Sequence, residues 1–141
     1  MGRNKSMGDR RLADMSDGDG DDPRYEPPKG RDEGLLYDVD LDDGHQLVVR
    51  MDTYKGKVVD FALMQNYLGL EWPEEVFRID CDHGEVHSHQ FFRDPSKEEE
   101  RRVIEVIPHR EGGWDCVDRN YSECYDRLLG GYGEHYRRWE S

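Results

Sequence analysis

Residues 77–92, FRIDCDHGEVHSHQFF, predict a β-hairpin. Two runs rich in β-branched and aromatic residues flank the dipeptide His83-Gly84, and glycine readily adopts the positive φ that a two-residue hairpin turn requires. The pairs that follow from such a turn are Asp82 with Glu85, Cys81 with Val86, Asp80 with His87, Ile79 with Ser88, and Arg78 with His89. A connection of two residues can join only antiparallel strands, because parallel strands need a much longer crossover.

The predicted pairing divides the hairpin into two faces, because successive side chains of a strand point to opposite sides of the sheet. The polar face carries Arg78, Asp80, His87 and His89. The apolar face carries Phe77, Ile79, Cys81, Val86 and Phe92. A three-residue, bulged turn would mix the two sets, so their separation supports the two-residue turn.

Further strands are predicted on both sides of the hairpin. Residues 46–54 and 57–68 are rich in strand-forming side chains and are joined by a tight turn at Lys55-Gly56. Residues 75–82 and 85–92 are the two hairpin strands. Ser96 followed by Glu99 matches a capping box and indicates a short helix through Arg102, whereas the alternation in residues 102–107 favours a fifth strand.

One long helix is predicted at residues 114–139, where apolar side chains recur every three to four positions. Gly130, Gly131 and Gly133 predict a kink or a break within it, since glycine costs about 1 kcal/mol relative to alanine in a helix interior. The expected fold is therefore α+β: an antiparallel meander of four to five strands packed by a long C-terminal helix.

The N-terminal residues 1–44 read as a disordered acidic tail in front of a single α+β domain at 45–141. The tail holds 13 acidic and 7 basic residues, together with the run DGDGDD at 17–22 and few apolar side chains. Leu35, Leu36 and Tyr37 are the exception, and they are expected either to add a short strand or to dock on the domain.

The formal net charge of −13 argues against nucleic-acid binding by broad phosphate neutralisation but leaves room for a local basic groove. Lysine accounts for only five of the 20 basic residues, which fits a salt-adapted, halophilic-like source; an ordinary acidic cytosolic protein is the alternative. Three cysteines without CxxC spacing indicate a reducing cytoplasm, and no apolar run reaches the ~20 residues of a membrane span.

The polar face of the hairpin is the candidate site. His87 and His89 offer an acid and a base for metal-free cleavage of a phosphodiester, Asp80 would orient an imidazole, and Arg78 would bind a phosphate or an oxyanion. The same histidines and Asp80 have the composition of a metal site. A third interpretation is that these side chains only meet solvent. In the turn, His83 and Asp82 are secondary binding candidates.

The run RIDCDHGEVHSH at 78–89, with YRRW at 136–139, resembles a family of short uncharacterised prokaryotic proteins in which an R-x-D-x-x-H-G-x-x-H-x-H hairpin precedes a terminal helix. The similarity covers about residues 45–139 and implies the same order of elements. The hairpin is more distantly similar to TumE-like toxins of toxin–antitoxin pairs, which carry an R-Y-D-N-A type strand before a histidine-rich strand. Cys81-Asp82 stands where those toxins have Asn-Ala.

Our leading sequence-based hypothesis is a toxin-like prokaryotic module that acts on or binds RNA through Arg78, Asp80, His87 and His89. This mechanism needs no cofactor and no metal, and it implies an antitoxin-like protein partner. One alternative is a non-enzymatic protein whose acidic surface binds a basic protein partner. The other alternative is a metal-binding protein. The sequence predicts no oligomeric state.

Overall fold

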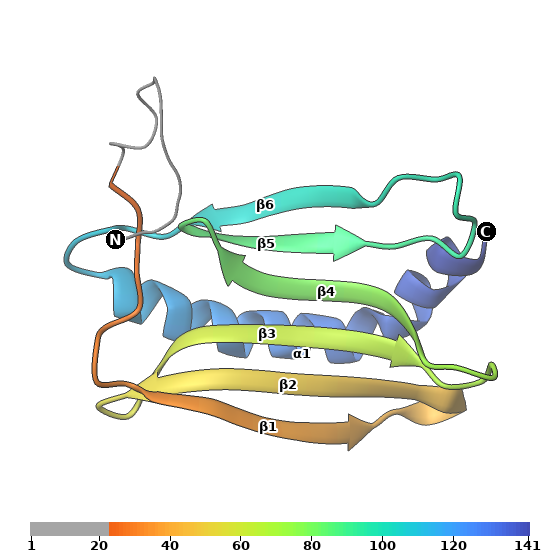
Figure 1. Ribbon diagram of the computed structural model, residues 1–141, viewed down its shortest axis with the longest axis horizontal. Helices are drawn as coiled ribbons and strands as arrows, with labels where there is room; N and C mark the ends of the chain where they lie inside the picture. The colour runs from red at the N-terminus through yellow and green to blue at the C-terminus, as the bar shows by residue number, and fades with distance from the viewer. Residues whose placement is uncertain (1–22) are drawn as a thin grey trace.

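The computed structural model describes residues 23–141 and shows a six-stranded antiparallel sheet with one long helix across one face (Figure 1). The strands follow one another across the sheet in the order of the sequence, so the sheet is a meander. The predicted α+β class is confirmed, with one strand more than the four to five expected.

The elements lie close to their predicted positions. The strands are β1 (Asp32–Asp40), β2 (His45–Tyr54), β3 (Lys57–Tyr67), β4 (Glu74–Asp82), β5 (Glu85–Gln90) and β6 (Glu100–Val106), and the helix is α1 (Gly113–Glu140). A short 3-10 turn at Asp42–Gly44 joins β1 to β2. The alternation noted at residues 102–107 is that of β6. The favoured fifth strand is thus confirmed over the alternative of a short helix from Ser96, where Asp94 instead accepts the backbone N–H of Ser96 at 2.9 Å and closes a turn.

The additional strand, β1, falls within the segment predicted as a tail. It pairs with β2 along most of its length, and Leu35 and Leu36 lie in it as exposed side chains. Asp52 of β2 anchors it, since its carboxylate accepts the N–H of Gly34 at 2.9 Å and the Nε–H of Arg31 at 3.0 Å. The sheet therefore starts at residue 32 rather than 45. Residues 1–22 of the predicted tail lie outside the described residues.

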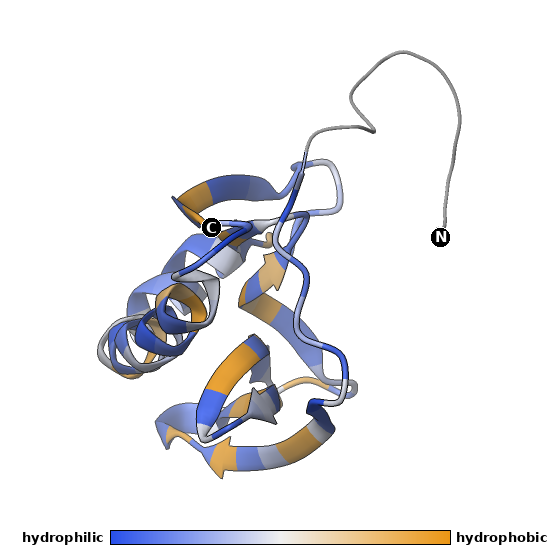
Figure 2. Cartoon of the chain, turned by 90° about the vertical axis from the view of Figure 1, so that its left-hand side faces the viewer, coloured by the Kyte–Doolittle hydropathy of each residue, from blue (hydrophilic) through white to orange (hydrophobic). Residues whose placement is uncertain are grey.

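The core lies between the helix and the sheet. Alternate side chains of β2 and β3 are buried there, as the alternation of hydrophobic and hydrophilic residues along the strands in Figure 2 illustrates. The helix contributes Val117, Cys124 and Leu128, spaced at intervals of seven and four residues, which place them on one helix face. Fully burying such side chains contributes about 1.5–3 kcal/mol each, so this contact fixes the helix against β3, β4 and β5.

Of the kink or break predicted at Gly130, Gly131 and Gly133, the break is wrong, because α1 is continuous from residue 113 to residue 140. Leu128 and Trp139 are both buried, one on each side of the glycines, and hold both parts of the helix on the sheet. The backbone N–H of Arg93 also donates to the carbonyl of Trp139 at 2.8 Å. Tertiary packing thus outweighs the low helix propensity of glycine. Among residues 23–141, no helix is both long and apolar enough to cross a membrane.

The segment before β1 packs against the N-terminal end of α1. The Tyr25 hydroxyl donates to the carbonyl of Val59 at 2.7 Å, and its ring packs against the core. A Cβ atom at Gly113 would lie 2.8 Å from the Tyr25 ring and 2.6 Å from the carbonyl oxygen of Pro108. The first helical residue must therefore be glycine for this segment to pack as it does.

We predict that Gly113→Ala destabilises the protein by about 1–3 kcal/mol, because its methyl group would overlap a backbone carbonyl that cannot easily move. Gly130→Ala in the same helix is the matched control: no heavy atom lies within 4 Å of its Cβ position, and we expect stabilisation by about 0.5–1 kcal/mol. Urea unfolding followed by circular dichroism measures both. Equal effects of the two substitutions would contradict the proposed packing of Tyr25.

Candidate functional site

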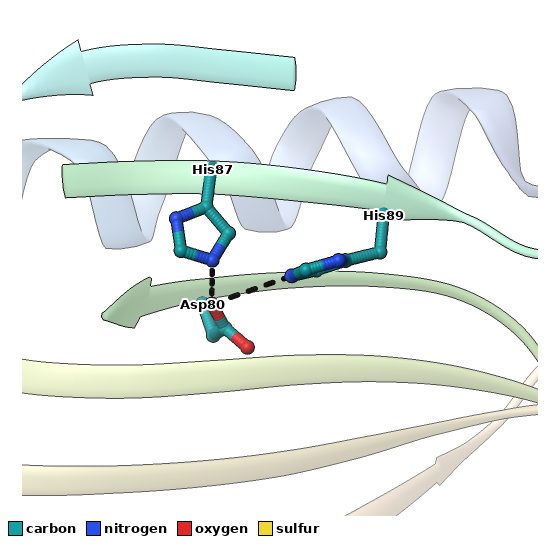
Figure 3. A group of neighbouring side chains, drawn as sticks. All are labelled: Asp80, His87 and His89. Carbon is teal, nitrogen blue, oxygen red and sulfur yellow. Dashed lines mark ion pairs between the residues drawn. The ribbon is translucent and has the colours of Figure 1, made fainter. Parts of the chain in front are cut away.

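The hairpin has the predicted register. Asp80 of β4 pairs with His87 of β5, and the neighbouring polar pair is Arg78 with His89. Figure 3 shows both histidine rings on the side of the sheet away from α1, with their side chains turned toward Asp80. The positive φ angles of His83 and Gly84, 55° and 77°, are those of the tight two-residue turn that sets this register.

The three side chains converge on one carboxylate oxygen. Nε2 of His87 lies 2.8 Å from Oδ1 of Asp80, and Nε2 of His89 lies 3.9 Å from the same oxygen. One ligand atom from each residue lies within 4.8 Å of the other two. Although Oδ1 is buried, it receives no hydrogen bond of acceptable geometry from residues 23–141. A buried carboxylate oxygen that no hydrogen bond of good geometry satisfies is uncommon, and a bound cation is one explanation for it.

The guanidinium of Arg78 pairs with two carboxylates, those of Glu75 and Asp80. Its guanidinium forms two hydrogen bonds with Glu75, at 2.8 and 2.9 Å, and these hold its pKa above the usual value. Nη1 lies 3.9 Å from Oδ2 of Asp80, the oxygen that the histidines do not face. The predicted role of Arg78 in binding a phosphate therefore requires it to leave Glu75, although 37% of its side chain is exposed.

In His89, Nδ1 contacts a carboxylate, and Nε2 is left able to bind a metal or a proton. Nδ1 forms a very short contact with Oε2 of Glu99, in the segment before β6. With the ring proton on Nδ1, that N–H donates to the carboxylate of Glu99, and the Nε2 lone pair is directed at Asp80. The side chains of His89 and Asp80 are each 16% exposed, so both border solvent.

His87 is buried much more deeply, with 2% of its side chain exposed. Burial lowers its pKa; Asp80 opposes this shift, and the positive charge of Arg101 adds to it. Nη2 of Arg101 lies 3.2 Å from Nδ1 of His87 and 2.9 Å from Oε1 of Glu85. Because a guanidinium can only donate, Nδ1 accepts, and the proton of the neutral ring is on Nε2, toward Asp80.

The turn residues lie apart from this cluster. His83 and Asp82 are well exposed, and the carboxylate of Asp82 accepts the backbone N–H of His83 at 3.0 Å. Their structural role is to close the turn, and His83 also lines a cavity with Arg24, Arg101 and His109. The structure thus brings together His87, His89 and Asp80, places Arg78 beside them, and leaves the two turn residues outside.

Glu85, Glu99 and Arg101 belong to the site but were not among the residues singled out from the sequence. Arg101 lies opposite His89 in the pairing of β5 with β6. The predicted fifth strand began at residue 102, so this pairing was not visible. Extending that strand by one residue toward its N-terminus, and pairing it with residues 85–92, would have placed Arg101 beside the histidines.

This arrangement is compatible with a bound divalent cation. Ligand bonds of 2.0–2.1 Å in a tetrahedral site separate neighbouring ligand atoms by ~3.3 Å, which lies between the two distances measured at Asp80 Oδ1. Without a metal, the same groups can act as proton donors and acceptors, with His89 as the accessible base.

The fold and site define a small α+β protein with a meander sheet, one covering helix and a His/Asp cluster on the uncovered face. Residues 26–140 match the model of a domain of unknown function, DUF7718, and the chain belongs to this family. The matched segment spans the whole sheet and the helix. An uncharacterised family was expected from the hairpin motif. The resemblance to TumE-like toxins stays a hypothesis. No similar curated protein and no similar solved structure is found.

His135 of α1 lies on the helix side of the sheet. Its ring stacks on Phe77 with centroids 3.6 Å apart, and Nδ1 lies 3.0 Å from Oε1 of Gln65. Burial lowers the pKa of His135 to about 4. The partly buried ring is therefore neutral at pH 7 and packs between the helix and the sheet.

We predict that His135 makes the stability pH-dependent. Since its folded pKa lies below the unfolded value of about 6.5, the unfolded chain binds a proton first, and the contribution of His135 is lost as pH falls from 6.5 toward 4. The free energy of unfolding of wild type minus that of His135→Gln should decrease by about 1 kcal/mol between pH 7 and pH 5. His83→Gln, at the exposed turn, is the control. A constant difference for His135→Gln would show that its ring is not protonated on unfolding.

Proposed function

We propose that this protein binds one divalent transition-metal ion, with zinc as the prototype, through Asp80, His87 and His89. The observation that carries the proposal is the buried Oδ1 of Asp80, which two imidazole nitrogens face at 2.8 and 3.9 Å although no described residue gives it a hydrogen bond of acceptable geometry. Two histidines and one carboxylate are a common ligand set of catalytic zinc sites, which keep a fourth position for water or substrate. A bound cation would supply the positively charged partner that this buried carboxylate oxygen needs.

The surroundings of His89 support the proposal. Histidines that bind metals commonly donate their other ring N–H to a carboxylate, which fixes the ring and increases its basicity. Glu99 occupies that position at Nδ1 of His89. The ring is therefore already oriented with its free nitrogen toward Asp80.

His87 needs one local rearrangement to become a ligand. A metal on Nε2 requires the ring proton to move to Nδ1, where Arg101 now donates. Oε1 of Glu85 lies 4.0 Å from Nδ1 and is the nearby acceptor for that proton. Metal binding would thus replace the contact of Arg101 with His87 by a contact of Glu85 with His87.

Burial favours metal binding over the two-histidine mechanism. An acid or base must come within hydrogen-bonding distance of its substrate. His87 is 2% exposed, and its two ring nitrogens already face Arg101 and Asp80. A metal ion needs only the central position between the three ligands, and solvent reaches it past Asp80 and His89.

We predict that the purified protein, freed of metal with a chelator, binds one equivalent of Zn²⁺ and is stabilised by it. Saturation at a hundred times the dissociation constant should add about 2.7 kcal/mol to the free energy of unfolding. Asp80→Asn should lower the affinity by at least ~10-fold, because it removes the charged ligand. Thermal unfolding with increasing zinc, and Co²⁺ titration followed by visible absorption, measure these effects.

Asp82→Asn is the matched control, since it removes the same charge from the same strand at an exposed position outside the cluster. His89→Gln provides a second test that leaves the buried His87 in place. The proposal fails if wild type shows no zinc-dependent shift, or if Asp80→Asn and His89→Gln respond to zinc as wild type does.

Action on RNA without a metal is a second candidate, favoured by the pairing of His89 with Glu99. A carboxylate-oriented imidazole at the border of solvent is the arrangement of a general base. This candidate predicts RNA cleavage that persists in excess EDTA and is lost in His89→Gln. Cleavage that requires added metal would assign the same residues to the metal site instead, and the absence of cleavage would leave RNA chemistry without support. The basic protein partner, the cytoplasmic location and the salt adaptation stay predictions from composition.

A further inference from the structure

A cavity of about 590 Å³ opens where the β4–β5 turn meets the chain that follows β6. Basic side chains from four segments border it: Arg24, His83, Arg101 and His109. Its other walls include Val106, Ile107 and Pro108, which are apolar. Glu85 is the one acidic residue among the lining side chains. In a chain of net charge −13, this is a local reversal of charge.

The turn glycine brings one of these basic residues into place. Gly84 has a φ of 77°, and a Cβ atom there would lie 3.2 Å from Cβ of Arg24. The absence of a side chain therefore lets the segment before β1 pass close to the turn. Arg24 and Arg101 reach the cavity from different segments, one from before the sheet and one from its last strand. A guanidinium presents a planar set of donors that suits phosphate oxygens.

We propose that this cavity binds a small phosphate monoester, with the phosphoryl group at Arg24 and Arg101 and the organic group against Val106 and Pro108. The two histidines at its border, His83 and His109, add N–H donors in either charge state. The cavity is larger than a phosphate alone requires, and its apolar wall accounts for the remaining volume. An acidic ligand avoids the repulsion that the rest of the surface would impose only if it enters this basic region.

Arg101 connects the cavity to the candidate metal site, and this part of the inference rests on the proposed function. The same Nη2 atom contacts Nδ1 of His87 and Oε1 of Glu85, and the side chain also lines the cavity. A metal on His87 displaces Arg101 from Nδ1, which leaves the guanidinium available to a phosphoryl group. Metal and phosphate monoester should therefore each strengthen the binding of the other, and by the same factor.

The cavity is tested first without metal. Phenyl phosphate is titrated into the full-length protein in EDTA at constant ionic strength, with isothermal titration calorimetry as the readout and inorganic phosphate as the comparison ligand. We expect saturable binding of phenyl phosphate, weaker binding of inorganic phosphate, and a loss of at least ~5-fold in affinity for Arg101→Gln and for Arg24→Gln. Arg102→Gln is the control, because it removes the same charge from the neighbouring residue, which pairs with Ser88 and has the opposite orientation on β6.

The proposal is overturned if phenyl phosphate does not saturate wild type, or if Arg102→Gln weakens binding as much as Arg101→Gln. Arg24→Gln keeps the test valid should Arg101→Gln fail to fold. The coupling is tested by Co²⁺ titration, where saturating phenyl phosphate should raise the metal affinity of wild type at least ~5-fold and leave that of Arg101→Gln unchanged. Phosphate binding without metal binding would overturn the proposed function and the coupling but support the cavity. Metal binding without phosphate binding would support the proposed function and overturn the cavity and the coupling.

Discussion

The pairing of β4 with β5 is the constraint on which both the core and the polar cluster depend. Ile79 and Val86 are almost fully buried on the helix side, and each contributes about 1.5–3 kcal/mol by its burial. A slip of one residue would expose these side chains and turn Asp80 toward the core. The burial of these core side chains therefore fixes the register that places the carboxylate and the imidazoles on the opposite face. The turn at His83-Gly84, with two positive φ angles, selects this register from the alternatives.

The polar face shows how unequal the surroundings of neighbouring histidines on one strand can be. His87 lies under Arg101 and is almost completely buried, whereas His89 borders solvent and contacts Glu99. The accepting nitrogen of His87 therefore points away from Asp80, whereas that of His89 points toward it. The chemistry of the pair depends on which of these nitrogens is unprotonated, and this in turn is decided by second-layer residues on β6 and beside it.

Much of the fold could be predicted from the sequence because the decisive signals are local. Turn glycines, alternating strands and a three-to-four-residue helical period all act over a few residues. The departures have non-local causes. β1 is held mainly by backbone pairing and by Asp52, with Val39 as its one apolar side chain packed against the core. The helix continues through its glycines because Leu128 and Trp139 are buried. The site was predictable where one hairpin supplies the residues. Arg101 was missed because its contact requires the pairing of a third strand.

Because β1 is weakly attached, it is expected to separate from β2 without unfolding of the rest of the protein. Nearly all of its side chains are exposed, so releasing it from β2 costs backbone hydrogen bonds, the charged contacts of Asp52 and the hydrogen bond between Tyr37 and Tyr121, but little hydrophobic burial beyond Val39. Such a strand forms a separate low-energy opening unit, distinct from global unfolding. Its amide protons should exchange with solvent while those of β3 stay protected. Each opening would briefly present the free edge of β2, a strand that carries buried side chains at Leu47 and Val49, to any neighbouring chain.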